Sequence, residues 1–268
     1  MRTFHIRDIH VGRQHPVLMG VLNISPESFY TGSYVPVTAV HEAAGKMFDE
    51  GAEILDIGAR STAPGSPPLS VYEETARMKE CLAELQGEDY VISIDTVHPQ
   101  VLDAALRFDI SLANDISGLC NPELGKVIND AGLPVILMAS GKSPGDARSL
   151  ADTHNSIEKV LNRAHECQIF DIILDPGIGK WVPDRTAEND WELCRHFHEL
   201  TAYNLPLLAA VSRKSFIGEL TGQPPAGRLA GTLAVTSRLI MEGASVIRAH
   251  DIPETRDVIR SVMHLVSP

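Results

Sequence analysis

The sequence predicts an α/β fold, namely a (β/α)8 TIM barrel of eight parallel strands inside a ring of helices. Short runs rich in Val, Ile and Leu alternate with longer segments of helical period along the whole chain. These runs are apolar throughout, which is expected for strands that are covered on both faces. The length of 268 residues suits one such barrel, so we expect a single domain over residues 1–268.

The expected elements follow one another as eight βα units. The strands are the short apolar runs at residues 17–23, 52–58, 91–95, 111–114, 134–138, 171–175, 205–211 and 245–250. The helices are the intervening segments, several of which begin with Pro, Ser or Thr or end on Gly or Asn, at residues 38–50, 70–85, 99–108, 122–131, 151–167, 188–203, 226–243 and 253–265. The two most turn-rich segments, 25–36 and 61–68, follow the first two strands and are expected to be active-site loops.

Composition and charge exclude several classes of protein. There are 35 acidic and 23 basic side chains, so the net charge is −12, which argues against a broad nucleic-acid face. The N-terminus is charged and no long apolar stretch follows, so we expect no membrane association and a cytoplasmic location. The four cysteines are widely spaced without a CxxC pair, which favours a reducing compartment over a zinc or disulfide framework.

Polar side chains end nearly every predicted strand, at the rim where active sites of such barrels lie. The strand ends carry Asn23, Asp56, Asp95, Asn114, Met138, Asp175, then Lys214 within 212–215, and Arg248 with His250. Any single Asp or Asn here could instead serve a turn or a helix cap. So many polar groups at one rim would be costly to bury without a ligand or water to satisfy them.

These side chains fall into chemical groups. Carboxylate and amide partners suited to a flat heterocycle are Asp95, Asn114 and Asp175. Positive charge for a phosphate or pyrophosphate would come from Lys214, Arg248 and His250. The neutral Asn23 could orient an anion or join a Mg²⁺ shell that keeps most of its waters. Together they indicate a heterocycle that carries a phosphorylated leaving group.

Seven segments in family order resemble the dihydropteroate synthases. They run from about residue 17 to the C-terminus and read MGVLNISPESF, GAEILDIGARSTAPG, SIDT, NDISG, LDPGIG, VSRKSFIG and GASVIRAHD. The resemblance implies a (β/α)8 transferase of folate biosynthesis, and in many members a homodimer. Its substrates would be 6-hydroxymethyl-7,8-dihydropterin pyrophosphate and p-aminobenzoate or a related arylamine, with pyrophosphate as the leaving group.

The same resemblance implies a role for each matching residue. The pterin would be held by Asp95, Asn114, Met138, Asp175 and Lys214. The pyrophosphate would meet Arg248 and His250, helped by Asn23 through Mg²⁺, and the arylamine would face Thr62 and Ser215. The implied path is dissociative, with the bond to pyrophosphate breaking before the amine captures a pterin cation. On this path Lys214, Arg248, His250 and Asp95 are the catalytic residues.

The departures from the family pattern gather in the loops around the arylamine. Arg60 stands where Glu is usual, and Ala63 where Arg is usual. Lys180 and Trp181 take a place where an aromatic residue would flank the aminobenzoate. Two alternatives therefore stay open: a methyltransferase or other enzyme acting on a reduced methyl- or methylene-pterin, and a non-catalytic pterin-binding protein. The leaving-group residues argue against both.

One histidine pair invites a metal-ligand interpretation. His196 and His198 are two residues apart, and on a helix that spacing points them to different faces. We therefore expect a solvated surface there rather than a metal site.

Overall fold

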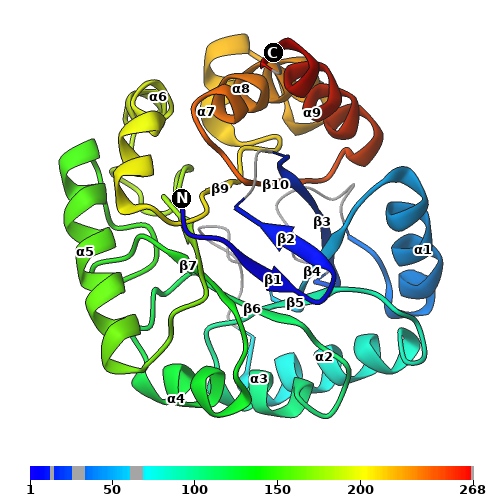
Figure 1. Cartoon of the computed structure of the whole chain (residues 1–268). Helices are drawn as coiled ribbons and strands as arrows, with labels where there is room; N and C mark the ends of the chain where they lie inside the picture. Colours follow the sequence, from blue (N-terminus) through cyan, green and yellow to red (C-terminus); the bar gives the residue numbers. More distant parts are fainter. Residues whose placement is uncertain (13–14, 26–33, 61–68, 267–268) are drawn as a thin grey trace.

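The computed structural model describes residues 1–12, 15–25, 34–60 and 69–266. Within them, eight parallel strands form one sheet in the order β8-β7-β6-β5-β4-β3-β10-β9. A parallel bridge between Leu174 and Leu207 joins the two ends of this sheet. The predicted barrel is confirmed, and Figure 1 shows the helices as a ring around the strands.

The strands lie where the apolar runs predict them. In chain order they are β3 (Val17–Asn23), β4 (Ile54–Gly58), β5 (Ile92–Asp95), β6 (Leu112–Asp115), β7 (Val135–Met138), β8 (Ile172–Asp175), β9 (Leu208–Ala209) and β10 (Val246–Ala249). The largest difference is β9, which has two residues where the run 205–211 predicts seven.

Helices connect the strands and cover the outside of the barrel. They are η2 (Val37–Ala39), α1 (Val40–Glu50), α2 (Val71–Glu84), α3 (Pro99–Ala105), α4 (Pro122–Ala131), α5 (Leu150–Glu166), α6 (Ala187–Arg195), η3 (Phe197–Tyr203), α7 (Ser215–Thr221), η4 (Pro225–Gly227), α8 (Leu229–Met241) and α9 (Ile252–Val266). Local sequence explains several ends. Ser70 and Glu73 form a capping box that begins α2, and Gly132 ends α4 at φ +64°.

Two helical predictions were wrong in detail. The helix expected over 188–203 ends at Arg195 and continues after His196 as the tighter η3. His196 and His198 each pair with a glutamate on the exposed surface, as a solvated face predicts. The short helix α7, which begins directly after Lys214, is not among the predicted helices.

An N-terminal hairpin that the sequence did not reveal closes one end of the barrel. Strands β1 (Phe4–Ile6) and β2 (Ile9–Val11) pair antiparallel, and Figure 1 shows them lying across the barrel. Three of their side chains join the apolar cluster inside the barrel: Phe4, Ile6 and Val11. They cover the amino-terminal ends of the strands, opposite the rim of polar residues.

Alternation along the strands divides their side chains between two cores. One set packs against the helices, for example Leu55 and Ile57 of β4. The other set points into the barrel, where an apolar layer contains Val17, Ile54, Leu112, Ile136, Ile173, Leu208 and Val246. Two residues further on, the inward positions include Asp56, Asn114, Asp175 and Arg248. The barrel interior therefore changes from apolar to polar within one step of the pleat.

In the described parts of the chain, no helix combines the length and apolar character that crossing a membrane requires.

The hairpin gives a first prediction. Ile6 is 2% exposed against the barrel core, so Ile6→Ala should lower the free energy of unfolding by about 2–5 kcal/mol. Ile9→Ala is the matched control, because Ile9 lies on the same hairpin but is only partly buried, and it should cost clearly less. Urea unfolding followed by circular dichroism measures both losses. Equal losses of stability in the two variants would contradict the conclusion that Ile6 packs into the end of the barrel.

Candidate active site

A buried carboxylate forms the centre of the polar layer. Asp56, on β4, is fully buried and accepts three hydrogen bonds. Its partners are Ser93 Oγ at 2.7 Å, Asn114 Nδ2 at 2.9 Å and Arg248 Nε at 2.6 Å. These donors come from β5, β6 and β10, so one carboxylate fixes side chains from three other strands. The arrangement leaves the Asn114 carbonyl oxygen and other Arg248 N–H groups for further partners.

Asp95 lies beside this network at the end of β5. Its carboxylate is 3.3 Å from an Arg248 terminal nitrogen. Burial and the nearby Asp56 carboxylate raise the pKa of Asp95 to about 7, although Arg248 and Arg60 oppose the rise. Near neutral pH the group therefore exchanges readily between donor and acceptor forms, which suits the edge of a heterocycle.

A second acid and a lysine stand on the other side of the mouth. Asp175 ends β8, accepts a hydrogen bond from the Gly177 amide at 2.7 Å, and has its pKa raised by burial. Burial likewise lowers the pKa of Lys214 to about 8, and Asp175 opposes that change. The Lys214 ammonium donates to the Ile178 carbonyl. An acid and a cation thus face the same loop.

His250 enters the site as a neutral imidazole. Its Nδ1 lies 2.8 Å from Ser212 Oγ, which also accepts a hydrogen bond from the His250 amide at 3.2 Å. Burial and then the Arg248 charge lower the pKa of His250 to about 4. The sequence predicts positive charge from His250, whereas this low pKa favours the neutral ring near neutral pH. Its ring can still form hydrogen bonds with an anion, while Lys214 and Arg248 provide the charge.

Arg213 is a structural residue that the sequence analysis missed. It is buried, with φ +56°, and pairs with both oxygens of Asp251 at 2.6 and 2.9 Å. It also donates to the carbonyls of Pro225 and Ala226. These bonds tie the turn after β9 to the end of β10 and so place Ser212 and Lys214.

Asp56 was recognised as a strand-end acid but was given no role. The signal that distinguishes it is its place inside the apolar strand ILDIG, two residues before the strand ends. A buried acid at such a position needs several partners from other strands. The structure supplies them.

The other predicted site residues are only partly brought together. Asn23 ends β3, and its Oδ1 lies 3.5 Å from the point that a Cβ at Gly58 would occupy, with the Asp95 carboxylate 3.8 Å from the same point. Met138 is fully buried at the end of β7. Ser215 is the first residue of α7. Thr62 and Ala63 lie outside the described residues.

The unusual loop residues contact the protein itself. Arg60 Nε lies 3.7 Å from the fully buried Glu74 carboxylate. The Trp181 indole N–H donates to the Gly177 carbonyl at 3.0 Å, whereas Lys180 is exposed.

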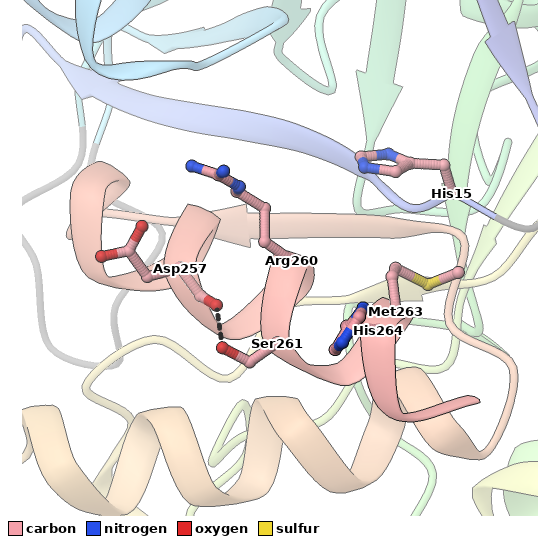
Figure 2. Close-up of a pocket in the computed structure, with 6 residues that line it drawn as sticks. All are labelled: His15, Asp257, Arg260, Ser261, Met263 and His264. Carbon is pink, nitrogen blue, oxygen red and sulfur yellow. Dashed lines mark hydrogen bonds between the residues drawn. The ribbon is translucent and has the colours of Figure 1, made fainter. Parts of the chain in front are cut away.

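A hollow lies elsewhere, beside the amino-terminal end of β3 (Figure 2). It has a volume of about 760 Å³ and is lined by His15, Asp257, Arg260, Ser261, Met263 and His264. It is shallow and open, and the strand-end residues take no part in it. Since catalytic groups of (β/α)8 barrels come from the carboxyl ends of the strands, we place the candidate active site at the Asp56 network.

The fold and this rim of residues define a class, the pterin-binding enzymes built on a (β/α)8 barrel. The family model described as "Pterin binding enzyme" matches residues 19–250, which is most of the chain. The chain is 33% identical over 260 residues to the dihydropteroate synthase of Escherichia coli strain K12, covering 92% of this chain and 91% of that protein. The Synechocystis dihydropteroate synthase is 38% identical over 250 residues, covering 88% and 85% respectively.

Solved structures agree with these relatives. A Yersinia pestis dihydropteroate synthase in a sulfonamide drug complex superposes with a TM-score of 0.89 at 29% identity, covering 98% of both chains. A Coxiella burnetii dihydropteroate synthase in complex with pteroic acid gives a TM-score of 0.87 at 30% identity, again covering 98% of both. The chain belongs to the dihydropteroate synthase family, transferases of folate biosynthesis, so the predicted family, fold and enzyme class are confirmed.

The raised pKa of Asp95 gives a second prediction. Its pKa is about 7 in the folded protein against an ordinary value of 3.8, so its contribution to stability is complete at acidic pH and is lost as the pH rises through about 7. Asp95→Asn, which cannot ionise, should therefore be more stable than the wild type near pH 8 but not near pH 4. Chemical denaturation at both pH values measures the difference. Parallel pH profiles for the two proteins would contradict this account of Asp95.

Proposed function

We propose that this chain joins 6-hydroxymethyl-7,8-dihydropterin pyrophosphate to p-aminobenzoate or a related arylamine and releases pyrophosphate. The observation that carries the proposal is the bonding of Asp56 to both Asn114 and Arg248. One buried carboxylate thereby holds both Asn114, which suits the pterin ring, and Arg248, which suits the pyrophosphate leaving group. The names of the relatives support the same reaction.

In this proposal the pterin lies across the mouth between the two acids. Asp95, Asn114 and Asp175 offer hydrogen-bond partners to its amino, ring N–H and carbonyl functions, and Met138 forms an apolar wall. Lys214 approaches from the start of α7. Both acids are buried, so their charges act strongly on any positive charge that develops on the pterin.

The pyrophosphate end would meet Arg248 and His250. The bond between the pterin methylene carbon and the pyrophosphate oxygen breaks, and both electrons leave with pyrophosphate. Arg248 stabilises the growing charge, and the neutral His250 contributes a hydrogen bond. The arylamine nitrogen then forms the new C–N bond and releases a proton. Because the amine meets a cation, no strong base is needed, which agrees with the low pKa of His250.

We propose Mg²⁺ as the metal that accompanies the pyrophosphate, with Asn23 as its contact in the protein. The fit rests on oxygen donors: Asn23 Oδ1 and the Asp95 carboxylate both line the space that glycine leaves at position 58. Mg²⁺ prefers oxygen ligands and keeps several waters, so one amide oxygen beside substrate phosphates suits it. When bound, it would neutralise charge on the leaving group. Thr62 and Ser215 are proposed to face the arylamine.

Assembly and location are part of the proposal. We infer a homodimer, supported by the apolar helix α8, which leaves Ala230, Ala234 and Met241 exposed. The βα units support one domain over residues 1–268, and the free cysteines 81, 120, 167 and 194 support a cytoplasmic location. Small-molecule pterin and arylamine ligands are the expected partners.

The reaction itself is tested with purified protein, Mg²⁺, the pterin pyrophosphate ester and p-aminobenzoate. Dihydropteroate and pyrophosphate should form in equal amounts. Release of pyrophosphate without coupling would contradict the arylamine assignment and retain the pterin assignment. A protein that binds neither the ester nor the pterin alcohol would contradict both.

Separate roles for the two halves of the site give a third prediction. Arg248→Ala removes a partner of the buried Asp56 and so affects both ligands, but binding of the pyrophosphate ester should weaken about 10- to 100-fold more than binding of the pterin alcohol, the effect of losing a charge-assisted hydrogen bond. Asp175→Asn should weaken both ligands alike. Arg195→Ala is the control, because that arginine is 55% exposed on α6. Titration calorimetry with the two ligands measures these changes, and equal losses for both ligands in Arg248→Ala would contradict its role.

The dimer gives a fourth prediction. Ala234→Glu, on the exposed side of α8, should convert the dimer to a monomer because it places a charge in an apolar interface. Tyr72→Glu, on α2 and 84% exposed, should leave the dimer intact. Light scattering coupled to size-exclusion chromatography measures the mass. A wild type that elutes as a monomer would contradict the homodimer.

A further inference from the structure

Trp181 belongs to the loop that follows β8 and lies beside Lys214. The Lys214 Nζ is 5.2 Å from the centre of the Trp181 ring, within the range of a cation–π contact. The indole N–H donates to the Gly177 carbonyl at 3.0 Å, two residues after Asp175. The ring is therefore anchored to the same strand end that carries one of the proposed pterin acids.

The loop after β7 holds the ring from another side. Gly145 has φ +61°, and a Cβ built on it would stand 2.2–2.4 Å from the Cγ, Cβ and Cδ1 atoms of Trp181. No side chain fits there unless the indole moves. The glycine thus brings the backbone of one loop directly against the tryptophan of the next, and the ring has little freedom to turn away from the lysine.

The remaining neighbours of Lys214 contact its side chain and change the pKa of its ammonium group. The ammonium donates to the Ile178 carbonyl, and a Cβ on Gly179 would stand 3.0 Å from the lysine Cδ and Nζ. The charged form is favoured by Asp175 and Asp190, whereas burial, Arg248 and Arg185 disfavour it. These opposing effects leave the pKa of Lys214 at about 8, where a modest contact decides the charge at neutral pH.

We propose that Trp181 is a positioning residue that holds the Lys214 side chain, as the ammonium, where it meets the pterin. This inference rests on the proposed function, which places Lys214 in the pterin site. The negative face of the indole attracts the ammonium, and the contact is strengthened by the partial burial of both groups.

The charge of Lys214 can be measured without any ligand. Trace acetylation with acetic anhydride across pH 6–10, followed by mass spectrometry, reports the fraction of each lysine that is uncharged. In the wild type, Lys214 should titrate near about 8, and the exposed Lys180 in the same sample serves as the internal reference. In Trp181→Leu the Lys214 midpoint should fall by about 0.5–1.5 pH units, the range that spans exposed to desolvated cation–π contacts. Trp181→Phe, which keeps an aromatic face, should shift it less.

Glycine variants provide a test that leaves the tryptophan in place. Gly145→Ala must displace the indole, so it should shift the Lys214 midpoint in the same direction as Trp181→Leu. Gly132→Ala is the matched control: Gly132 also has positive φ, +64°, but an added Cβ meets nothing within 4 Å. It introduces the same backbone strain without moving Trp181 and should leave Lys214 unchanged. These variants keep the test available if Trp181→Leu does not fold.

Kinetics separate positioning from general stability. Trp181→Leu should raise the KM for the pterin pyrophosphate ester several-fold, more at pH 8.5 than at pH 6.5, with kcat little changed. A Lys214 midpoint that stays at its wild-type value in both Trp181→Leu and Gly145→Ala would overturn the inference. A wild type that shows the predicted titration but binds no pterin would instead contradict the proposed function.

Discussion

The burial of the Asp56 carboxylate is the constraint on which the rest of the site depends. A fully buried acid is costly unless several donors satisfy it, and here Ser93, Asn114 and Arg248 do so from three other strands. Those donors can reach it only if the strands keep their register around the barrel. The same bonds orient the amide and the guanidinium toward the open end. The hydrogen bonds of Asp56 therefore both fix the strand register and position the side chains of the site.

The cationic side chains near the open end of the barrel differ in how many of their hydrogen-bond donors already have partners in the protein. Arg185 and Arg213 donate hydrogen bonds to Asp190, Asp251 and backbone carbonyls, so their role is to hold loops in place. Arg248 is half committed to Asp56, and Lys214 donates to a single carbonyl, which leaves both with donors for an anion. A chain of net charge −12 thus still presents two cationic side chains at the strand ends. With His250 neutral, that site has two charges rather than the three that the sequence suggests.

Most of the barrel could be predicted because a buried parallel strand leaves a strong local signal, an apolar run that ends in a polar residue. The N-terminal hairpin gave no such signal, since its three-residue strands bury only Phe4, Ile6 and Val11 against residues far along the chain. Site residues at strand ends were likewise visible, but their partners were not. That Asp56 joins Arg248, or that Arg213 pairs with Asp251, depends on strand register and on φ at one residue, which a one-dimensional pattern does not contain.

The loop departures follow a common physical pattern. Arg60 approaches Glu74, a fully buried acid of α2 that also accepts a hydrogen bond from Thr96 at 2.6 Å. Trp181 meets a glycine that leaves room for its ring. In both cases the unusual residue contacts a partner on a separate segment of the chain, which is helix α2 for Arg60 and the loop after β7 for Trp181. A residue without a structural role on a surface loop would need no such partner. The described contacts of Arg60 and Trp181 therefore tie these two positions to other segments of the same chain.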